Sequence, residues 1–144
     1  MTRVLIVEAR FYDELADELL AGATAELDGS GTDYDVVSVP GALEIPAVVA
    51  MAAKSGRYDG AVALGCVIQG ETGHYDIVAG QSARGLMDVA VNKRFAIGNG
   101  ILTTDTKAQG LARAARNKGN KGRAAVKACL AVIAVKQRLV KSDG

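Results

Sequence analysis

The chain of 144 residues carries 17 Lys and Arg against 16 Asp and Glu, and 49% of its residues are hydrophobic. This length fits one domain, expected to span residues 1–144, with a substantial buried core. The first apolar run, residues 4–7, is too short for a signal peptide or a membrane span. Cys66 and Cys129 have no metal-type spacing. We therefore expect a cytoplasmic protein with reduced thiols, no metal and no membrane partner.

The charges are unevenly distributed along the chain. Residues 1–104 hold 7 of the 17 basic side chains and 14 of the 16 acidic ones, so residues 105–144 hold 10 and 2. Such a basic segment favours an anionic partner, which could be a phosphorylated substrate, a nucleic acid or the acidic surface of another subunit. A solvated basic helix face is the alternative, and the net charge of +1 argues against nucleic acid.

Hydrophobic patterning predicts strands that alternate with helices. The expected strands are residues 4–8, 34–39, 60–65 and 95–102, the last interrupted by Gly98-Asn99-Gly100. The expected helices are residues 13–27, 44–54, 75–91, one that is capped within 103–106 and ends near 117, and 123–139, followed by a frayed end at 141–144. Each crossover is long enough to be right-handed. The pattern predicts a three-layer, flavodoxin-like α/β sandwich with a four-stranded parallel sheet.

The stretch from Gly65 to Tyr75 joins the third strand to the next helix and holds the only histidine, His74. Free N–H groups and a helix N-terminus at such a turn favour a bound phosphate or carboxylate. Ligands of open parallel sheets usually bind past the carboxyl ends of the strands. The alternative is a tight loop that needs glycine for its backbone, with a histidine that merely caps the helix.

Three loops, residues 10–12, 41–44 and 67–74, follow strand ends and are expected to converge, with Asn99 near the end of the fourth strand. They would bring together an aromatic ring, backbone amides and an imidazole that can move protons near neutral pH. The chain has no Ser-His-Asp order, metal cluster or GxxxxGK[ST] motif, so condensation or elimination by proton relay is favoured.

The single candidates also have ordinary structural interpretations. Phe11 could be a core or lid residue, Glu44 could be a helix N-terminal carboxylate, and Arg113 and Lys121 could be surface charges. The grouping of Arg113 and Lys121 with further basic residues around one break makes a phosphate contact more credible than either residue alone.

Five blocks carry a family resemblance: residues 9–12 (ARFY), 39–46 (VPGALEIP), 65–75 (GCVIQGETGHY), 98–103 (GNGILT) and 113–122 (RAARNKGNKG). In this order they resemble 6,7-dimethyl-8-ribityllumazine synthase, the penultimate enzyme of riboflavin biosynthesis. The resemblance implies condensation of 5-amino-6-(D-ribitylamino)uracil with 3,4-dihydroxy-2-butanone 4-phosphate, with release of phosphate and water. It implies no cofactor and no metal.

The resemblance also implies roles for individual residues. Phe11 would stack on the pyrimidine, and Ala42, Leu43 and Glu44 would bind the ribityl chain. Cys66, Val67 and Ile68 would hold the uracil edge, Glu71 and Thr72 would face the phosphate, and His74 would transfer protons. Asn99, Arg113 and Lys121 would come from a neighbouring subunit, with Arg113 on the phosphate and Lys121 near the uracil.

Members of this family assemble as pentamers or multiples of them, so the resemblance implies a homo-oligomer with the helix at 75–91 as a subunit contact. Positions that depart from the family pattern, and that bear on the assembly, are Gln69, Gln81, Lys107, Ala112 and Arg116. Two rival functions are an assembly-forming module that binds flavin or lumazine with little catalysis, and an anion-binding assembly that packages nucleic acid.

Overall fold

A computed structural model of the chain describes residues 1–141. Of the residues 141–144 that were expected to fray, Lys141 is the last residue of a helix and 142–144 lie outside the described part. Within that part the strands are β1 (Arg3–Ala9), β2 (Asp33–Val39), β3 (Gly60–Ile68) and β4 (Ala96–Thr104). They form one parallel sheet in the order β2-β1-β3-β4. The carboxyl ends of all the strands therefore meet at one edge.

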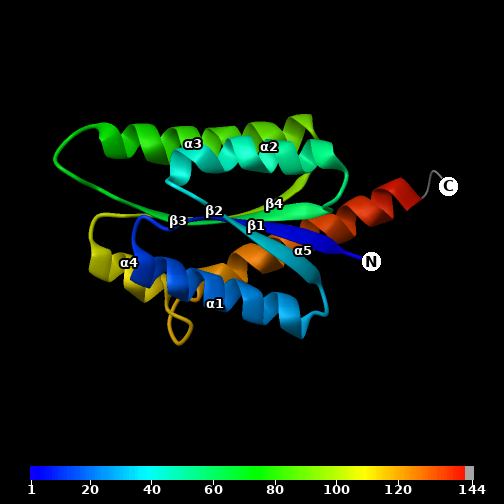
Figure 1. Cartoon of the computed structure of the whole chain (residues 1–144), viewed down its shortest axis with the longest axis horizontal. Helices are drawn as coiled ribbons and strands as arrows, with labels where there is room; N and C mark the ends of the chain where they lie inside the picture. The colour runs from blue at the N-terminus through cyan, green and yellow to red at the C-terminus, as the bar shows by residue number, and fades with distance from the viewer. Residues whose placement is uncertain (142–144) are drawn as a thin grey trace.

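Helices cover both faces of this sheet (Figure 1). The 3₁₀ turn η1 (Ala42–Glu44) leads into α2 (Ile45–Ser55), which lies beside α3 (His74–Asn92) on one face. The other face carries α1 (Asp13–Gly29), α4 (Lys107–Ala114) and α5 (Lys121–Lys141). The predicted three-layer α/β class with a four-stranded parallel sheet is confirmed.

The core has two halves because successive side chains of a strand point to opposite faces. In β1, Val4 and Ile6 are buried in the cluster under α1 and α5, whereas Leu5 and Val7 are buried in the cluster under α2 and α3. The near-continuous burial of β1 is typical of a strand covered on both faces.

Two predicted strand boundaries were wrong. β3 continues through Ile68, because Cys66 and Ile68 are paired with Leu102 and Thr104 of β4. β4 is not interrupted at its glycines. A Cβ on Gly98 would lie 1.9 Å from the carbonyl oxygen of Ala125, so this glycine lets α5 pack directly on the strand rather than ending it.

α5 starts at Lys121 rather than at residue 123, and the helices differ from the prediction in two further places. α4 starts at a capping box in which the Thr106 hydroxyl accepts from the backbone N–H of Gln109, and it ends at Ala114 rather than near residue 117. Along α3, Ser82 is buried while Ile77, an apolar residue of the same helix, is 58% exposed. No described helix has the length and apolar content needed to span a membrane.

Candidate functional site

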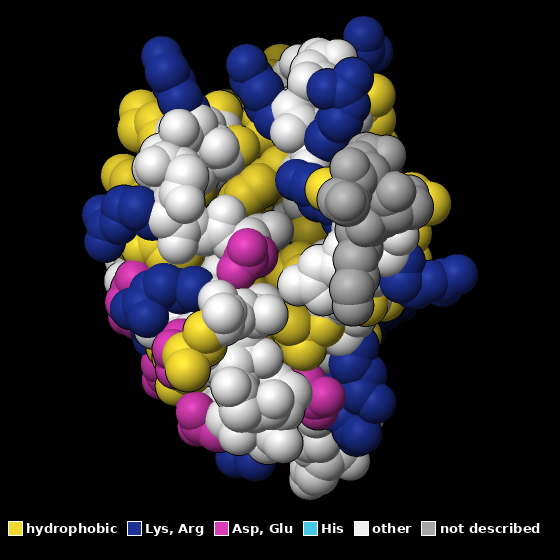
Figure 2. Space-filling view, turned by 90° about the vertical axis from the view of Figure 1, so that its right-hand side faces the viewer, with side chains coloured by type: hydrophobic (Ala, Val, Ile, Leu, Met, Phe, Trp, Pro, Cys, Tyr) yellow, Lys and Arg dark blue, Asp and Glu magenta, His cyan; other side chains and the backbone are white. Residues whose placement is uncertain are grey.

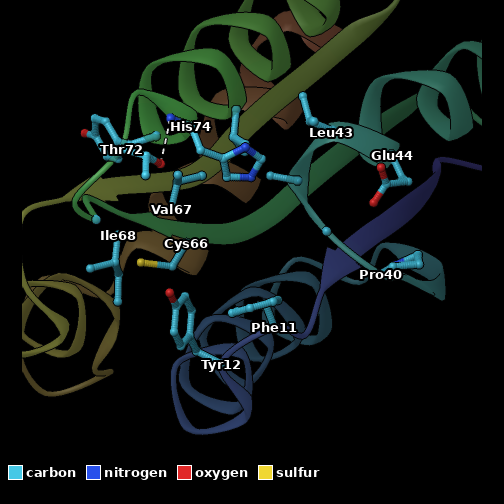
Figure 3. Close-up of a pocket in the computed structure, with 15 residues that line it drawn as sticks. Phe11, Tyr12, Pro40, Leu43, Glu44, Cys66, Val67, Ile68, Thr72 and His74 are labelled. Atoms are coloured by element: carbon cyan, nitrogen blue, oxygen red, sulfur yellow. Dashed lines mark hydrogen bonds between the residues drawn. The ribbon is translucent and has the colours of Figure 1, made fainter.

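A cavity of about 500 Å³ lies past the carboxyl ends of β1, β2 and β3. The three loops that were expected to converge do meet around it (Figure 3). Its lining residues are Phe11, Tyr12, Pro40, Gly41, Ala42, Leu43, Glu44, Cys66, Val67, Ile68, Gly70, Thr72, His74, Tyr75 and Val78. The cavity occupies the place that ligands favour in open parallel sheets.

The loop after β1 contributes an unusually accessible aromatic ring. The side chain of Phe11 is 75% exposed, and its ring meets that of Tyr12 edge to face, with the centroids 5.0 Å apart and the planes at 72°. An exposed phenyl ring loses the stabilisation that burial of apolar surface would bring. A planar ligand in the cavity could recover this by covering the free face of the ring.

The loop after β2 is folded into η1, which places two different groups at the cavity. Ala42 is buried, whereas Leu43 and Glu44 are exposed. The Glu44 N–H donates to the Gly41 carbonyl oxygen at 3.2 Å, which closes the turn. Glu44 is also the N-cap of α2, next to Pro46 in its first turn. A carboxylate is stabilised at this end of a helix and can accept hydrogen bonds from ligand hydroxyls.

The β3–α3 connection supplies the imidazole. His74 is the first residue of α3, and its backbone N–H donates to the Thr72 hydroxyl at 3.3 Å. Figure 3 shows its ring directed into the cavity, between Val67 and Leu43. The ring therefore lies at a helix N-terminus, whose free N–H groups are suited to an anion.

Cys66 at the end of β3 forms part of the cavity wall. Burial raises the pKa of its thiol, while the Thr104 hydroxyl, 4.0 Å from the sulfur, and the charge of Arg113 act in the opposite direction. With the pKa raised overall, the thiol stays neutral and is a poor nucleophile. Cys66 is thus suited to shaping the cavity rather than to covalent catalysis.

The structure separates the predicted site residues into two groups. Those assigned to one subunit line the cavity, except Glu71, which is exposed next to Thr72. Asn99, Arg113 and Lys121 do not line it. Asn99 lies in mid-strand opposite Ala63, not near the strand end, because β4 runs on to Thr104.

Several lining residues escaped prediction, including Tyr12, Pro40, Tyr75 and Val78. Val78 could have been found from helical geometry, because it lies one turn after His74 on the same side of α3. Pro40 and Tyr12 are direct neighbours of residues that were singled out.

Among the described residues, the cavity wall holds the carboxylate of Glu44 and the imidazole of His74 but no Lys or Arg. The described residues also form no group of three or more His, Cys, Asp or Glu that could hold a metal ion. The chemistry available within one chain is therefore hydrogen bonding, ring stacking and proton transfer. A strongly anionic ligand group would find no basic side chain in this wall.

Comparison with known proteins identifies relatives along nearly the whole chain. A similar protein from Methylobacterium radiotolerans, named 6,7-dimethyl-8-ribityllumazine synthase, is 59% identical over 135 residues, which cover 94% of this chain and 82% of the relative. A protein from Rhizobium meliloti, named 6,7-dimethyl-8-ribityllumazine synthase 1, is 58% identical, with coverage of 94% and 92%. The family model described as 6,7-dimethyl-8-ribityllumazine synthase matches residues 1–137. The chain belongs to the 6,7-dimethyl-8-ribityllumazine synthase family.

Proposed function

We propose that this protein is a transferase that condenses 5-amino-6-(D-ribitylamino)uracil with 3,4-dihydroxy-2-butanone 4-phosphate to 6,7-dimethyl-8-ribityllumazine, releasing phosphate and water in riboflavin biosynthesis. The observation that carries the proposal is that Phe11, Glu44 and His74 meet around one cavity in a chain of this family. Each of the three offers a different interaction that the two substrates need.

The pyrimidine substrate would occupy the part of the cavity beneath Phe11. Its planar ring would stack on the exposed phenyl group, and its uracil edge would meet Cys66, Val67 and Ile68 at the end of β3. Backbone groups at a strand end are suited to pair with the alternating donors and acceptors of a uracil. The ribityl chain would extend along Ala42 and Leu43 to Glu44, whose exposed carboxylate can accept its hydroxyl protons.

His74 would transfer protons during the condensation. An amine that adds to a carbonyl must lose a proton, and the oxygen that leaves as water must gain one, so a group that can both accept and donate is required. Imidazole has this property near neutral pH. The place of His74 at the cavity wall supports this role, while Glu71 and Thr72 would present groups to the phosphate at the start of α3.

The phosphate-binding cation would come from another subunit. The cavity wall lacks Lys and Arg, and the candidate basic residues Arg113 and Lys121 lie outside it, in α4 and at the start of α5. Two different surfaces of the chain must then meet, one with the cavity and one with Asn99, Arg113 and Lys121. Such a heterologous contact closes into a ring when its rotation permits.

A pentamer or a multiple of it is our proposed assembly, following the family resemblance. Exposed apolar side chains on α3 support a role for this helix in subunit contact, since Ile77, Met87 and Val91 are each more than half exposed. The two free cysteines agree with a reducing compartment, which we propose to be the cytoplasm.

The reaction can be tested by mixing the purified protein with both substrates and following lumazine fluorescence and phosphate release together. The proposal predicts that both signals rise at the same rate and that neither rises when one substrate is omitted. A folded oligomer that binds lumazine but forms none would contradict the proposal. The native mass of the particle, measured on the same sample, gives the number of subunits.

A further inference from the structure

Glu8 is a buried carboxylate outside the cavity wall. It lies in β1, is 4% exposed, and shares the α1-facing side of the strand with Val4 and Ile6. A buried carboxylate is costly unless charged or polar partners satisfy it. Glu8 lies three residues before Phe11, so its partners affect how the loop after β1 is held.

The partners of Glu8 come from β2 and from the loop after β1. Ser38, its register partner in β2, donates a hydrogen bond from its hydroxyl to Oε2 at 2.8 Å. Arg10 donates from Nη1 to Oε1, also at 2.8 Å. The carboxylate therefore links the ends of two strands to the loop that carries the exposed ring.

Arg10 continues this link into the first turns of α1. Its Nη2 contacts the Asp17 carboxylate, and its Nε lies 3.4 Å from the Asp13 carboxylate. The Arg10 guanidinium thus bridges β1 and α1 across the loop. Its planar set of N–H donors can contact several carboxylates at once, which the single ammonium group of a lysine does less well. Glu8, Arg10, Asp13, Asp17 and Ser38 are called the Arg10 cluster below.

The Phe11 ring itself has few contacts that could orient it. Its side chain is 75% exposed and meets the ring of Tyr12, and Tyr12, the N-cap of α1, makes no side-chain capping hydrogen bond. Tyr12 packs against the core, while Arg10, on the other side of Phe11, ties the loop to β1 through Glu8 and to α1 through Asp17. We propose that the Arg10 cluster positions the Phe11 ring at the cavity, so that Glu8 and Arg10 are positioning residues for binding of the pyrimidine substrate.

This inference rests on the proposed function, in which Phe11 stacks on the pyrimidine. Arg10→Lys keeps the positive charge but removes the fork, and Glu8→Gln keeps the shape but removes the negative charge. We expect each to raise the KM for the pyrimidine by about 3- to 10-fold, the size of one aromatic contact. The KM for the phosphorylated substrate should change less than about 2-fold, because its binding does not involve the ring.

The matched control is Asp35→Asn. Asp35 also links β1 to β2 through an arginine, since Arg3 donates to its carboxylate at 2.9 Å, but this pair lies at the amino end of the sheet. It should lower thermal stability and leave both KM values unchanged. A double variant, Arg10→Lys with Phe11→Ala, then tests the route: if Arg10 acts through Phe11, Arg10→Lys raises the KM no further once the ring is absent.

Amide hydrogen exchange of residues 9–14 gives a readout that does not depend on turnover. Exchange there should be faster in Arg10→Lys than in wild type and unchanged in Asp35→Asn. Unchanged exchange in Arg10→Lys overturns the inference, as does an equal rise of both KM values or a further rise in the double variant. If the wild type forms no lumazine, the proposed function fails on its own, while hydrogen exchange still decides whether the cluster holds the loop.

Discussion

The two ends of the parallel sheet each carry a cavity, and the two cavities differ in what their polar groups do. The one at the carboxyl ends measures about 500 Å³ and the one at the amino ends about 660 Å³. Figure 2 views the amino end, where apolar side chains show between Lys and Arg side chains. The amino-end cavity is lined by Tyr58, Asp59, Lys93, Phe95 and Lys136, among others.

At the amino end the fold itself uses most of these polar groups. Lys136 donates to the Arg94 carbonyl oxygen at 2.8 Å, Asp59 accepts from the Arg3 N–H at 2.9 Å, and the Tyr58 hydroxyl donates to Asp35. At the carboxyl end, no described residue forms a hydrogen bond with the Glu44 carboxylate or the His74 ring. The two cavities therefore differ less in volume than in their polar groups, most of which are paired at the amino end and available to a ligand at the carboxyl end.

The largest expected effect comes from removing the imidazole of His74. His74→Ala should lower kcat by about 10²- to 10⁴-fold, the usual contribution of a placed proton-transfer group, with the native mass unchanged. Lys136→Ala in the amino-end cavity is the matched control and should keep kcat within about 2-fold of wild type. Equal turnover of His74→Ala and wild type would remove His74 from the reaction.

The second test concerns where the phosphate binds. Arg113→Ala should raise the KM for the phosphorylated substrate by about 10- to 100-fold, because a charge-assisted hydrogen bond is lost, and should affect the pyrimidine far less. Lys93→Ala removes a basic group that lines the amino-end cavity and should have no such effect. A larger rise of this KM in Lys93→Ala than in Arg113→Ala would indicate that the phosphate binds at the other end of the sheet.

The third test removes the aromatic face. Phe11→Ala should raise the KM for the pyrimidine by about 3- to 10-fold, because one stacking contact disappears. The melting temperature should hardly change, since the ring is 75% exposed. Val135→Ala removes an apolar side chain, 47% exposed, from α5 and should change neither value. A large loss of stability in Phe11→Ala would show that the ring is a structural residue instead.

The order of strands and helices could be predicted because each element has its own hydrophobic period, and a parallel sheet then brings the loops after its strands to one edge. Gly98 and Gly100 misled the prediction for β4 because glycine commonly breaks strands. The reason is close tertiary packing: a Cβ on Gly98 would lie 1.9 Å from the Ala125 carbonyl oxygen of α5, and one on Gly100 would lie 2.8 Å from the Ala63 carbonyl oxygen of β3. Local patterning carries no information about such a contact.

The site could be predicted only in part for a similar reason. Phe11, Glu44 and His74 follow strand ends, so the topology brings them together once the sheet is known to be parallel. Arg113 lies outside the cavity wall of its own chain, and the pattern of one chain does not encode which surfaces of two chains would meet. Ile77 is apolar and stands at helical spacing with buried residues of α3, yet it is exposed, because such spacing has the same signature whether the residue is buried or not.

The reactivity of the two cysteine thiols tests the difference between the cavity wall and the buried core without substrates. Cys66 lines the carboxyl-end cavity, whereas Cys129 is buried, its Sγ 3.8 Å from the Ala96 carbonyl oxygen, and burial raises the pKa of its thiol to about 12. At pH 8 iodoacetamide should modify Cys66 slowly and leave Cys129 intact until the protein unfolds. Bound lumazine should protect Cys66. Peptide mass spectrometry measures both, and modification of Cys129 in folded protein would contradict this picture.

The smallest expected effect is the pH dependence of the amino-end network. Hydrogen bonds from the Tyr58 hydroxyl at 2.7 Å and from the Arg3 guanidinium hold the pKa of Asp35 below its ordinary value. Because the folded-state pKa is the lower one, the stabilisation is present above the unfolded pKa of about 3.9 and is lost as the pH falls towards the folded value. The melting temperatures of wild type and Asp35→Asn, at one protein concentration, should therefore differ at pH 7, and the difference should shrink as the pH falls below about 3.9. A constant difference would mean that the network acts through shape rather than charge. Turnover at pH 7 should stay the same in both proteins, because the proposed site lies at the other end of the sheet.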